Sequence, residues 1–471
     1  MVTAAARSVP GAYTRLVDRR EYTSHDAVAL AGLARRGEVT PAELAVAAGE
    51  QHHRTHPVIN AVVEWYDPET VGVPPTGGPL AGVPFLRKDI GSTEAGRLVE
   101  MGSRLAVGLR ASETSPYFRA LAAAGAQVLG RTAVPEFAQH GTTETELVGP
   151  TRNPVDPGTS AGGSSGGAAA AVRAGVVPLA HASDSAGSIR IPASVTGLLG
   201  LKPGRGRPPG CGFDWSGLLV ELVIARSVRD LATALSVLAA PAPGPPPDSR
   251  RRGGPRRIAL SLDHWAGGTT EPAVREAVEA TARALEAAGH TVEPIGRPFS
   301  YEQLMSTWFP LFGLGIAELI QTTAARTGRP AAAPNLEPNT LEMLERVAAL
   351  PAGARSEALV AGELVAVDLE LHLAGFDALL TPTLDRAVVP LGRMAGSCPM
   401  DQYLADGDQW FDRLYLANVT GWPALSVPAP VPPGTPPVGA QLMAPPGGEE
   451  GLLGLAADLL GDTVVAAVVD P

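Results

Sequence analysis

The order of helical and extended segments predicts an α/β protein in which helices cover a β-sheet. Two observations support this fold class. From Leu80 onward, apolar segments with strand character alternate with amphipathic segments, and glycine and proline residues separate them. After the proline- and arginine-rich stretch at residues 239–255, a strand–helix–strand order resumes at residues 258–295. Because that order continues the same pattern, we do not divide the chain at this loop.

The composition is that of a large globular protein. The 471 residues are 45% hydrophobic and 18% charged, which is enough for a sizeable core. A formal net charge of −11 argues against general binding to nucleic acid or to an anionic membrane. Cys211 and Cys398 are far apart, so two free thiols are expected. No apolar run approaches the length of a membrane span, and the N-terminus lacks an apolar signal region. We therefore expect a cytoplasmic protein.

Residues 1–60 are expected to form an arm and a helical preface to the main domain, residues 61–471. Ser24 can cap a helix that ends at Gly37. The sequence Thr40-Pro41-Ala42-Glu43 then predicts a capping box with proline at the first helical position. Two helices should therefore precede the sheet.

The remaining elements follow from local signals. Proline at a first helical position and glycine after the last one indicate where helices begin and end, and short apolar runs between turns indicate strands. Helices are expected at residues 115–125, 168–174 and 270–289 and from residue 452 onward, and residues 299–350 are expected to be mostly helical. Strands are expected at residues 126–129, 176–180, 258–262, 291–295, 378–380, 424–427 and 438–443.

Residues 158–202 form the stretch around which the chain is organised. Small residues dominate it, with Ser164 inside a GGSSGG sequence and Ser188 inside DSAGSIR. Small residues before a serine can turn successive N–H groups into one concavity that holds an oxyanion. A serine also needs a base. His181 lies on an apolar strand and is expected to be a satisfied core residue. Lys88 ends an apolar run upstream and can act as a base if burial lowers its pKa from about 10.4.

The chain resembles the amidase signature family in three features that occur in the same order and spacing: Lys88, the GGSSGG block and the DSAGSIRIP block. Further segments that resemble the family lie at residues 123–132, 135–138, 225–231, 380–383, 418–424 and 437–442. The resemblance covers roughly residues 25–465. It implies a single large domain with a central mixed β-sheet covered by helices on both faces.

The resemblance also implies a Ser–cisSer–Lys triad. Lys88 would be the base, Ser164 the bridging serine in a cis peptide, and Ser188 the nucleophile that forms an acyl-enzyme. No metal and no organic cofactor is expected. The oxyanion hole is expected from the backbone N–H groups of Ser185, Ala186, Gly187 and Ser188.

Asp184 and Arg190 are assigned supporting roles, because a carboxylate and a guanidinium beside a turn can fix its backbone. A plain surface ion pair is the alternative. The chain departs from the family at three places. Ala186 replaces a glycine before the nucleophile, and His181-Ala182 replaces an apolar residue and a glycine. Residues 222–226 lack the Gly-Pro that commonly precedes the Ala-Arg pair. These departures affect the expected substrate more than the expected activity.

We expect an amidase that hydrolyses a small neutral amide with an apolar or aromatic acyl part. Phe213 and Trp215 lie among glycine and proline residues, where a pocket is a better expectation than a core. Trp308 is a further pocket candidate, with a core position as its alternative. The expected partners are the small-molecule amide and, in a homodimer, a second copy of the chain.

Other functions remain open at this point. An acyl transferase or amide-forming enzyme would use the same acyl-enzyme and pass the acyl group to an amine. A glutaminase subunit of a tRNA-dependent amidotransferase, which has this family's fold, would need partner subunits. A non-catalytic scaffold would not need the two serines and the lysine. The sequence around Ser164 also matches the G-x-S-x-G of α/β-hydrolases, but two prolines precede it where that fold requires a strand.

Overall fold

The computed structural model describes residues 18–67, 70–72, 75, 77–210, 217–239, 254–461, 464, 468–469 and 471. Its centre is an 11-stranded sheet. In spatial order the strands are β1 (Val62–Trp65), β3 (Gln127–Thr132), β2 (Pro84–Lys88), β6 (Leu179–Asp184), β8 (Val220–Ala225), β7 (Leu199–Lys202), β12 (Ala424–Pro428), β13 (Gly439–Met443), β11 (Ala378–Pro382), β9 (Arg257–Leu260) and β10 (Thr291–Pro294). A separate pair is formed by β4 (Glu144–Thr145) and β5 (Gly149–Pro150).

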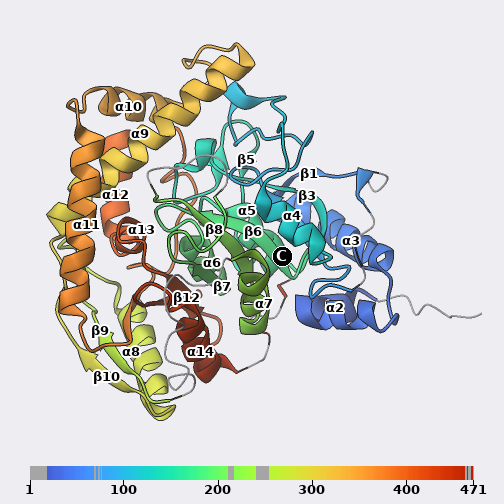
Figure 1. Cartoon of the computed structure of the whole chain (residues 1–471). Coiled ribbons are helices and arrows are strands. Elements are labelled where there is room, and N and C mark those ends of the chain that lie inside the picture. The colour runs from blue at the N-terminus through green and yellow to red at the C-terminus, as the bar shows by residue number, and fades with distance from the viewer. Residues whose placement is uncertain are drawn as a thin grey trace, which may run out of the picture.

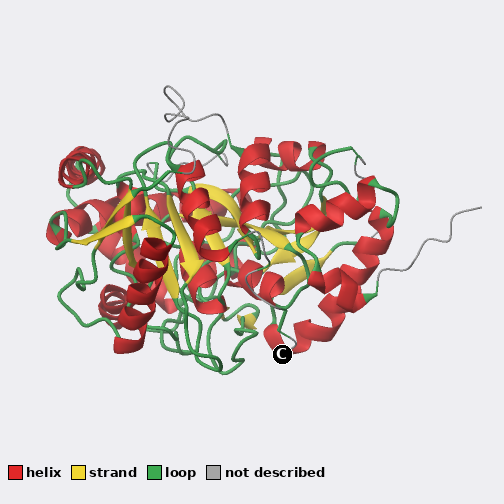
Figure 2. Ribbon diagram, turned by 90° about the horizontal axis from the view of Figure 1, so that it is seen from below, coloured by secondary structure: helices red, strands yellow, loops and turns green. Residues whose placement is uncertain are grey.

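The sheet is mixed, as expected. Strand β2 runs parallel to β3 and β6, and β9 runs parallel to β10 and β11. From β6 to β11 the neighbouring strands are antiparallel. Figure 2 shows the strands between helices on both sides. The expected single large domain with a central mixed sheet covered by helices is therefore confirmed.

The helices lie around the sheet, and Figure 1 labels most of them. They are α1 (Arg19–Ser24), α2 (Ala27–Arg35), α3 (Pro41–Ile59), α4 (Pro116–Ala123), α5 (Gly166–Arg173), α6 (Arg190–Thr196), α7 (Val228–Leu238), α8 (Pro272–Ala287), α9 (Tyr301–Thr327), α10 (Pro338–Ala348), α11 (Ala354–His372), α12 (Met400–Trp410), α13 (Tyr415–Val419) and α14 (Glu449–Leu460). Helices α5 to α8 and α14 pack against the sheet, whereas α9 to α13 form a group beside it.

Most local signals are confirmed, and two need correction. The capping box at Thr40 is present, with Pro41 at the helix start. The cap of α2 is Asp26 and not Ser24, because the Asp26 carboxylate accepts from the N–H of Ala29. Strand β6 begins at Leu179, three residues later than expected. Its side chains are buried on both faces, so no alternation marks where the strand starts.

Helix α9 is long and apolar enough to cross a membrane by length and composition. The expectation that no apolar run approaches a membrane span is therefore wrong for Tyr301–Thr327. Half of its most apolar window is buried inside the protein, where α10 and α11 pack against it. That environment is typical of a core helix.

The outward face of α11 carries exposed Val360, Leu364, Val367 and Leu371. The expected homodimer stays a prediction.

Candidate active site

Two parallel neighbouring strands bring the candidate base and the nucleophile turn to one edge of the sheet. Strand β2 ends at Lys88, and its neighbour β6 ends at Asp184. Because the carboxyl ends of adjacent parallel strands lie at the same edge, residues that follow both strands meet there. The turn after β6 leads through Ser188 into α6, and the loop that contains Ser164 leads into α5.

Lys88 is fully buried, and its Nζ lies 2.8 Å from Ser164 Oγ. Nζ also lies 2.9 Å from Ser183 Oγ and 3.3 Å from the Ser183 carbonyl oxygen. Burial lowers the pKa of Lys88 from 10.5 to about 7, although the carboxylates of Asp184 and Glu221 act in the opposite direction. All three oxygens can accept from Nζ, which has three N–H donors when protonated and two N–H donors and one lone pair when neutral.

Ser164 follows a cis peptide bond from Gly163, as the resemblance implies. A Cβ at Gly163 would lie 2.6 Å from the Thr142 carbonyl group and 2.7 Å from the His140 carbonyl oxygen. The loop that carries Ser164 is thus pressed against residues 140–142 and has no room for a side chain before the serine.

Asp184 organises the turn that contains Ser188. Its carboxylate accepts from the N–H of Gly187 at 2.7 Å and from the N–H of Ile189 at 3.2 Å. Arg190 donates to both carboxylate oxygens at 2.9 Å and also bonds Asn418. Asp184 and Arg190 are both fully buried, so the alternative of a surface ion pair is wrong. The pKa of Asp184 is about 2, because Arg190 outweighs the effect of burial, which alone would raise it.

One part of the expected oxyanion hole needs correction. The N–H of Gly187 is occupied by the Asp184 carboxylate and is not free for a substrate oxygen. The aspartate at the start of the turn folds back and accepts a hydrogen bond from one of the four expected donors, a contact that the run of small residues does not indicate. The N–H groups of Ser185, Ala186 and Ser188 are left for that role.

Ser188 is 8% exposed and lies close to the Ser164 loop, since the N–H of Ser165 donates to the Ser188 carbonyl at 3.3 Å. Within the described residues no hydrogen bond joins the hydroxyls of Ser188 and Ser164. Catalytic hydrogen bonds are often long in an unliganded enzyme and shorten only with substrate. The link between the two serines therefore belongs to the proposed mechanism.

A narrow cavity adjoins Ser188, and only about 20 Å³ of it admits a water-sized group. Its walls are formed by Ala138, Gln139, His140, Gly141, Ala186, Ile191, Trp308, Phe312, Tyr403, Phe411 and Tyr415. Trp308 stacks on Tyr415 with ring centroids 4.2 Å apart. It is therefore both a buried residue and part of the cavity wall. Phe213 and Trp215, the other two expected pocket residues, lie outside the described residues.

A second polar layer lies behind Lys88. The backbone N–H of Lys88 donates to His181 Nδ1 at 3.2 Å, which leaves Nε2–H of His181 to face Glu221 at 3.2 Å. Glu221 also accepts from the N–H and hydroxyl of Ser92, at 2.8 and 2.5 Å. His181 is thus a satisfied core residue, as expected. Nothing in the sequence had indicated a role for Glu221 or Ser183 at this site.

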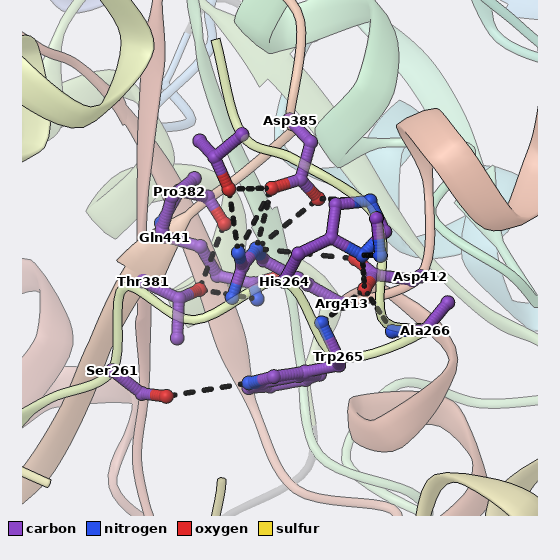
Figure 3. A network of polar contacts seen from close by, with 12 residues as sticks. Ser261, His264, Trp265, Ala266, Thr381, Pro382, Asp385, Asp412, Arg413 and Gln441 are labelled. Atoms are coloured by element: carbon purple, nitrogen blue, oxygen red, sulfur yellow. Dashed lines mark hydrogen bonds and ion pairs between the residues drawn. The ribbon is translucent and has the colours of Figure 1, made fainter. Parts of the chain in front are cut away.

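Hydrogen bonds also connect the turn that contains Ser188 to strands further along the sheet. Arg190 Nη1 donates to Gln441 at 2.7 Å, and Gln441 Nε2 donates to Thr381 at 3.2 Å. Figure 3 shows Gln441 and Thr381 beside a buried cluster around Arg413. Two strands, β11 and β13, therefore help to hold the turn through a single arginine.

That cluster contains His264, Asp385 and Asp412, whose side-chain ligand atoms lie within 4.8 Å of one another (Figure 3). Arg413 lies beside these three residues and donates to the Asp385 carboxylate at 2.8 Å. Burial alone would raise the pKa of Asp385, but Arg413 outweighs it and lowers the pKa. Burial and the neighbouring Asp385 hold the pKa of Asp412 well above its ordinary value. The arginine supplies the positive charge that a metal would bring, and we assign no metal here.

Comparisons with known proteins place the chain in a family. A family model described as Amidase matches residues 72–453. The chain belongs to the amidase signature family.

A 6-aminohexanoate-cyclic-dimer hydrolase of Paenarthrobacter ureafaciens is 32% identical over 464 residues, which cover 93% of this chain and 94% of the relative. The structure of a 6-aminohexanoate cyclic dimer hydrolase complexed with substrate superposes with a TM-score of 0.83 at 32% identity, and covers 94% of this chain and 97% of that chain. A bacterial aryl acylamidase of the amidase signature family has a TM-score of 0.77 at 25% identity, over 95% of this chain and 96% of that chain. These amidase signature relatives are hydrolases that act on amides.

Proposed function

We propose that the chain is an amidase that hydrolyses a small neutral amide through an acyl-enzyme on Ser188. The observation that supports this most is the buried Lys88, which lies 2.8 Å from Ser164 and has a pKa of about 7. A lysine that is half neutral at pH 7 can act as a base, whereas an exposed lysine cannot.

The first half-reaction forms the acyl-enzyme. Ser188 Oγ attacks the amide carbonyl carbon, its proton passes to Ser164 Oγ, and the Ser164 proton passes to the lone pair of Lys88 Nζ. The tetrahedral oxyanion is stabilised by the free N–H groups of the turn at Ser185, Ala186 and Ser188. When the C–N bond breaks, the leaving amine takes a proton from Ser164, which recovers one from Lys88.

The second half-reaction hydrolyses the ester. A water molecule attacks the acyl carbon, its proton travels by Ser164 to Lys88, and the same path returns a proton to Ser188 as the acid leaves. The hydrogen bonds that Lys88 Nζ donates to Ser183 keep Nζ aimed at Ser164 throughout. The residues described supply each proton transfer without a further group.

The cavity beside Ser188 supports an apolar or aromatic acyl part. Phe312, Phe411 and Tyr415 contribute aromatic surface, and Trp308 stacks between Phe312 and Tyr415. Because the water-sized space is so small, the substrate enters only as these side chains turn. Transfer of the acyl group to an amine uses the same residues, so it remains the second candidate, and a glutaminase subunit and a non-catalytic scaffold rank below it.

Labelling with a fluorophosphonate tests the nucleophile. We expect one adduct on Ser188, located by peptide mass spectrometry, and none on a Ser188→Ala variant. An adduct elsewhere that survives Ser188→Ala would refute the assignment. Amide turnover in water without an added amine separates hydrolysis from transfer, since a transferase would release product only when an acceptor amine is present.

A further inference from the structure

His140 lines the cavity beside Ser188 and is 2% exposed. Its Nε2 lies 2.8 Å from Asn339 Oδ1. The Asn339 amide is oriented by its own bond from Nδ2 to the Cys398 carbonyl at 2.8 Å, so its oxygen must face His140. The oxygen can only accept, and His140 therefore carries its proton on Nε2.

The other ring nitrogen of His140 then holds a lone pair. Burial lowers the pKa of His140 to about 4, so the ring stays neutral at pH 7. Among the described residues, Nδ1 has no hydrogen-bond partner although it is buried. His140, a residue of the cavity wall, thus carries one unpaired buried acceptor.

Trp308 provides the complementary group. Its ring lies between Phe312 and Tyr415, and the side chain is 5% exposed. Its indole N–H is buried and has no acceptor among the described residues. Among the other polar groups in the wall, the Tyr403 hydroxyl is satisfied, since it donates to the Gln139 carbonyl and accepts from the Gly141 N–H. Two residues of the wall, His140 and Trp308, therefore carry an unpaired buried acceptor and an unpaired buried donor.

Buried polar groups are normally paired, and an unpaired one in a binding site indicates what the ligand supplies. No wall residue is charged while His140 is neutral, so a charged ligand group would find no counter-charge. A group that can both donate and accept, and that carries no charge, satisfies both atoms.

We propose that the acyl part of the substrate bears such a neutral group, a second carboxamide, which donates to His140 Nδ1 and accepts from the Trp308 indole N–H. This inference rests on the proposed function, because it assumes that the cavity beside Ser188 receives the acyl part. It narrows the substrate class from an apolar amide to an apolar amide with one polar group along its acyl chain.

Binding to the inactive Ser188→Ala variant tests the inference without depending on turnover. Isothermal titration calorimetry would compare succinamide, glutaramide and adipamide with the alkyl monoamides of the same chain length. We expect at least one diamide to bind about tenfold more tightly than its monoamide, the gain expected from pairing groups that are otherwise left buried and unpaired. Equal binding, tighter binding of the monoamides, or no binding of either would overturn the proposal.

Two substitutions in the same background locate the contacts. Trp308→Phe keeps an aromatic ring and removes the indole N–H, and His140→Leu removes the acceptor. Each should reduce the preference for the diamide over its monoamide several-fold. Trp265→Phe is the matched control, because the Trp265 indole bonds Ser261 outside the cavity and the preference should stay unchanged. A preference that survives both Trp308→Phe and His140→Leu would refute the assignment. Loss of fluorophosphonate labelling at Ser188 in the parent chain would instead overturn the proposed function.

Discussion

Replacing Lys88 by methionine should abolish catalysis and change how stability depends on pH. In the unfolded chain Lys88 binds a proton below about pH 10.5, whereas in the folded chain it does so only below about pH 7. Between these values the unfolded chain holds more protons than the folded one. The free energy of unfolding of the parent protein therefore rises with pH through this window and levels off above it. Methionine has no proton to bind, so the variant lacks this dependence.

The size of the effect follows from the shift. Lowering the pKa of Lys88 from 10.5 to about 7 corresponds to about 4 kcal/mol at pH 7, where the folded lysine is half protonated, and to less than about 1 kcal/mol at pH 10. Relative to Lys88→Met, the parent protein should therefore gain about 3 to 4 kcal/mol of unfolding free energy between pH 7 and pH 10. The hydroxyls of Ser164 and Ser183 lose a partner in the variant, but that cost is the same at both pH values and cancels in the comparison.

Urea unfolding of both proteins, followed by fluorescence at several pH values, measures this difference. Other groups that titrate contribute equally to both chains and drop out. If the difference in unfolding free energy between the two proteins stays constant within about 1 kcal/mol from pH 7 to pH 10, Lys88 is charged in the folded protein. That result would refute its role as the base.

Three further outcomes follow from the site. The sequence contains only two lysines, so NMR of protein labelled at the lysine side chain should show two titrating signals, and the Lys88 signal should titrate at the pH where kcat/KM rises. Glu221→Gln removes a carboxylate that raises the pKa of Lys88, so both the signal and the activity profile should move to lower pH, and a profile that does not move contradicts the network behind Lys88. Asp184→Asn leaves Arg190 buried without its counter-charge, so unfolding free energy should fall by about 3–5 kcal/mol in urea denaturation, and a loss below about 1 kcal/mol would refute the buried pair.

Much of the fold and of the site can be predicted from the sequence, because the signals are local. The capping box at Thr40, the strand–helix–strand order after residue 255 and the small residues around Ser164 and Ser188 all act over a few neighbouring positions. The placement of Lys88 against Ser164 came from the family resemblance, and the parallel pairing of β2 with β6 supplies its physical reason.

The parts that could not be predicted depend on contacts between distant segments. Glu221 reaches His181 only because β8 pairs with β6 in a particular register, in which Val223 lies opposite His181. The tautomer of His140 is set by Asn339, 199 residues away in the chain. Ser183 directly precedes Asp184, but its contact with Lys88 requires the neighbouring strand. No local pattern encodes these pairs.

The two lysines also show why geometry, and not titration alone, favours Lys88 as the proposed base. Of the 37 basic residues only Lys88 and Lys202 are lysines, and an arginine is protonated at any pH that an enzyme meets. Both lysines are buried, and burial lowers both pKa values to about 7. Lys202 Nζ, however, bonds the Pro203 carbonyl, which has no proton to give, whereas Lys88 Nζ lies against two serine hydroxyls. A neutral amine becomes a catalytic base only where it faces a proton donor that leads toward the substrate, and within the described structure only Lys88 meets that condition.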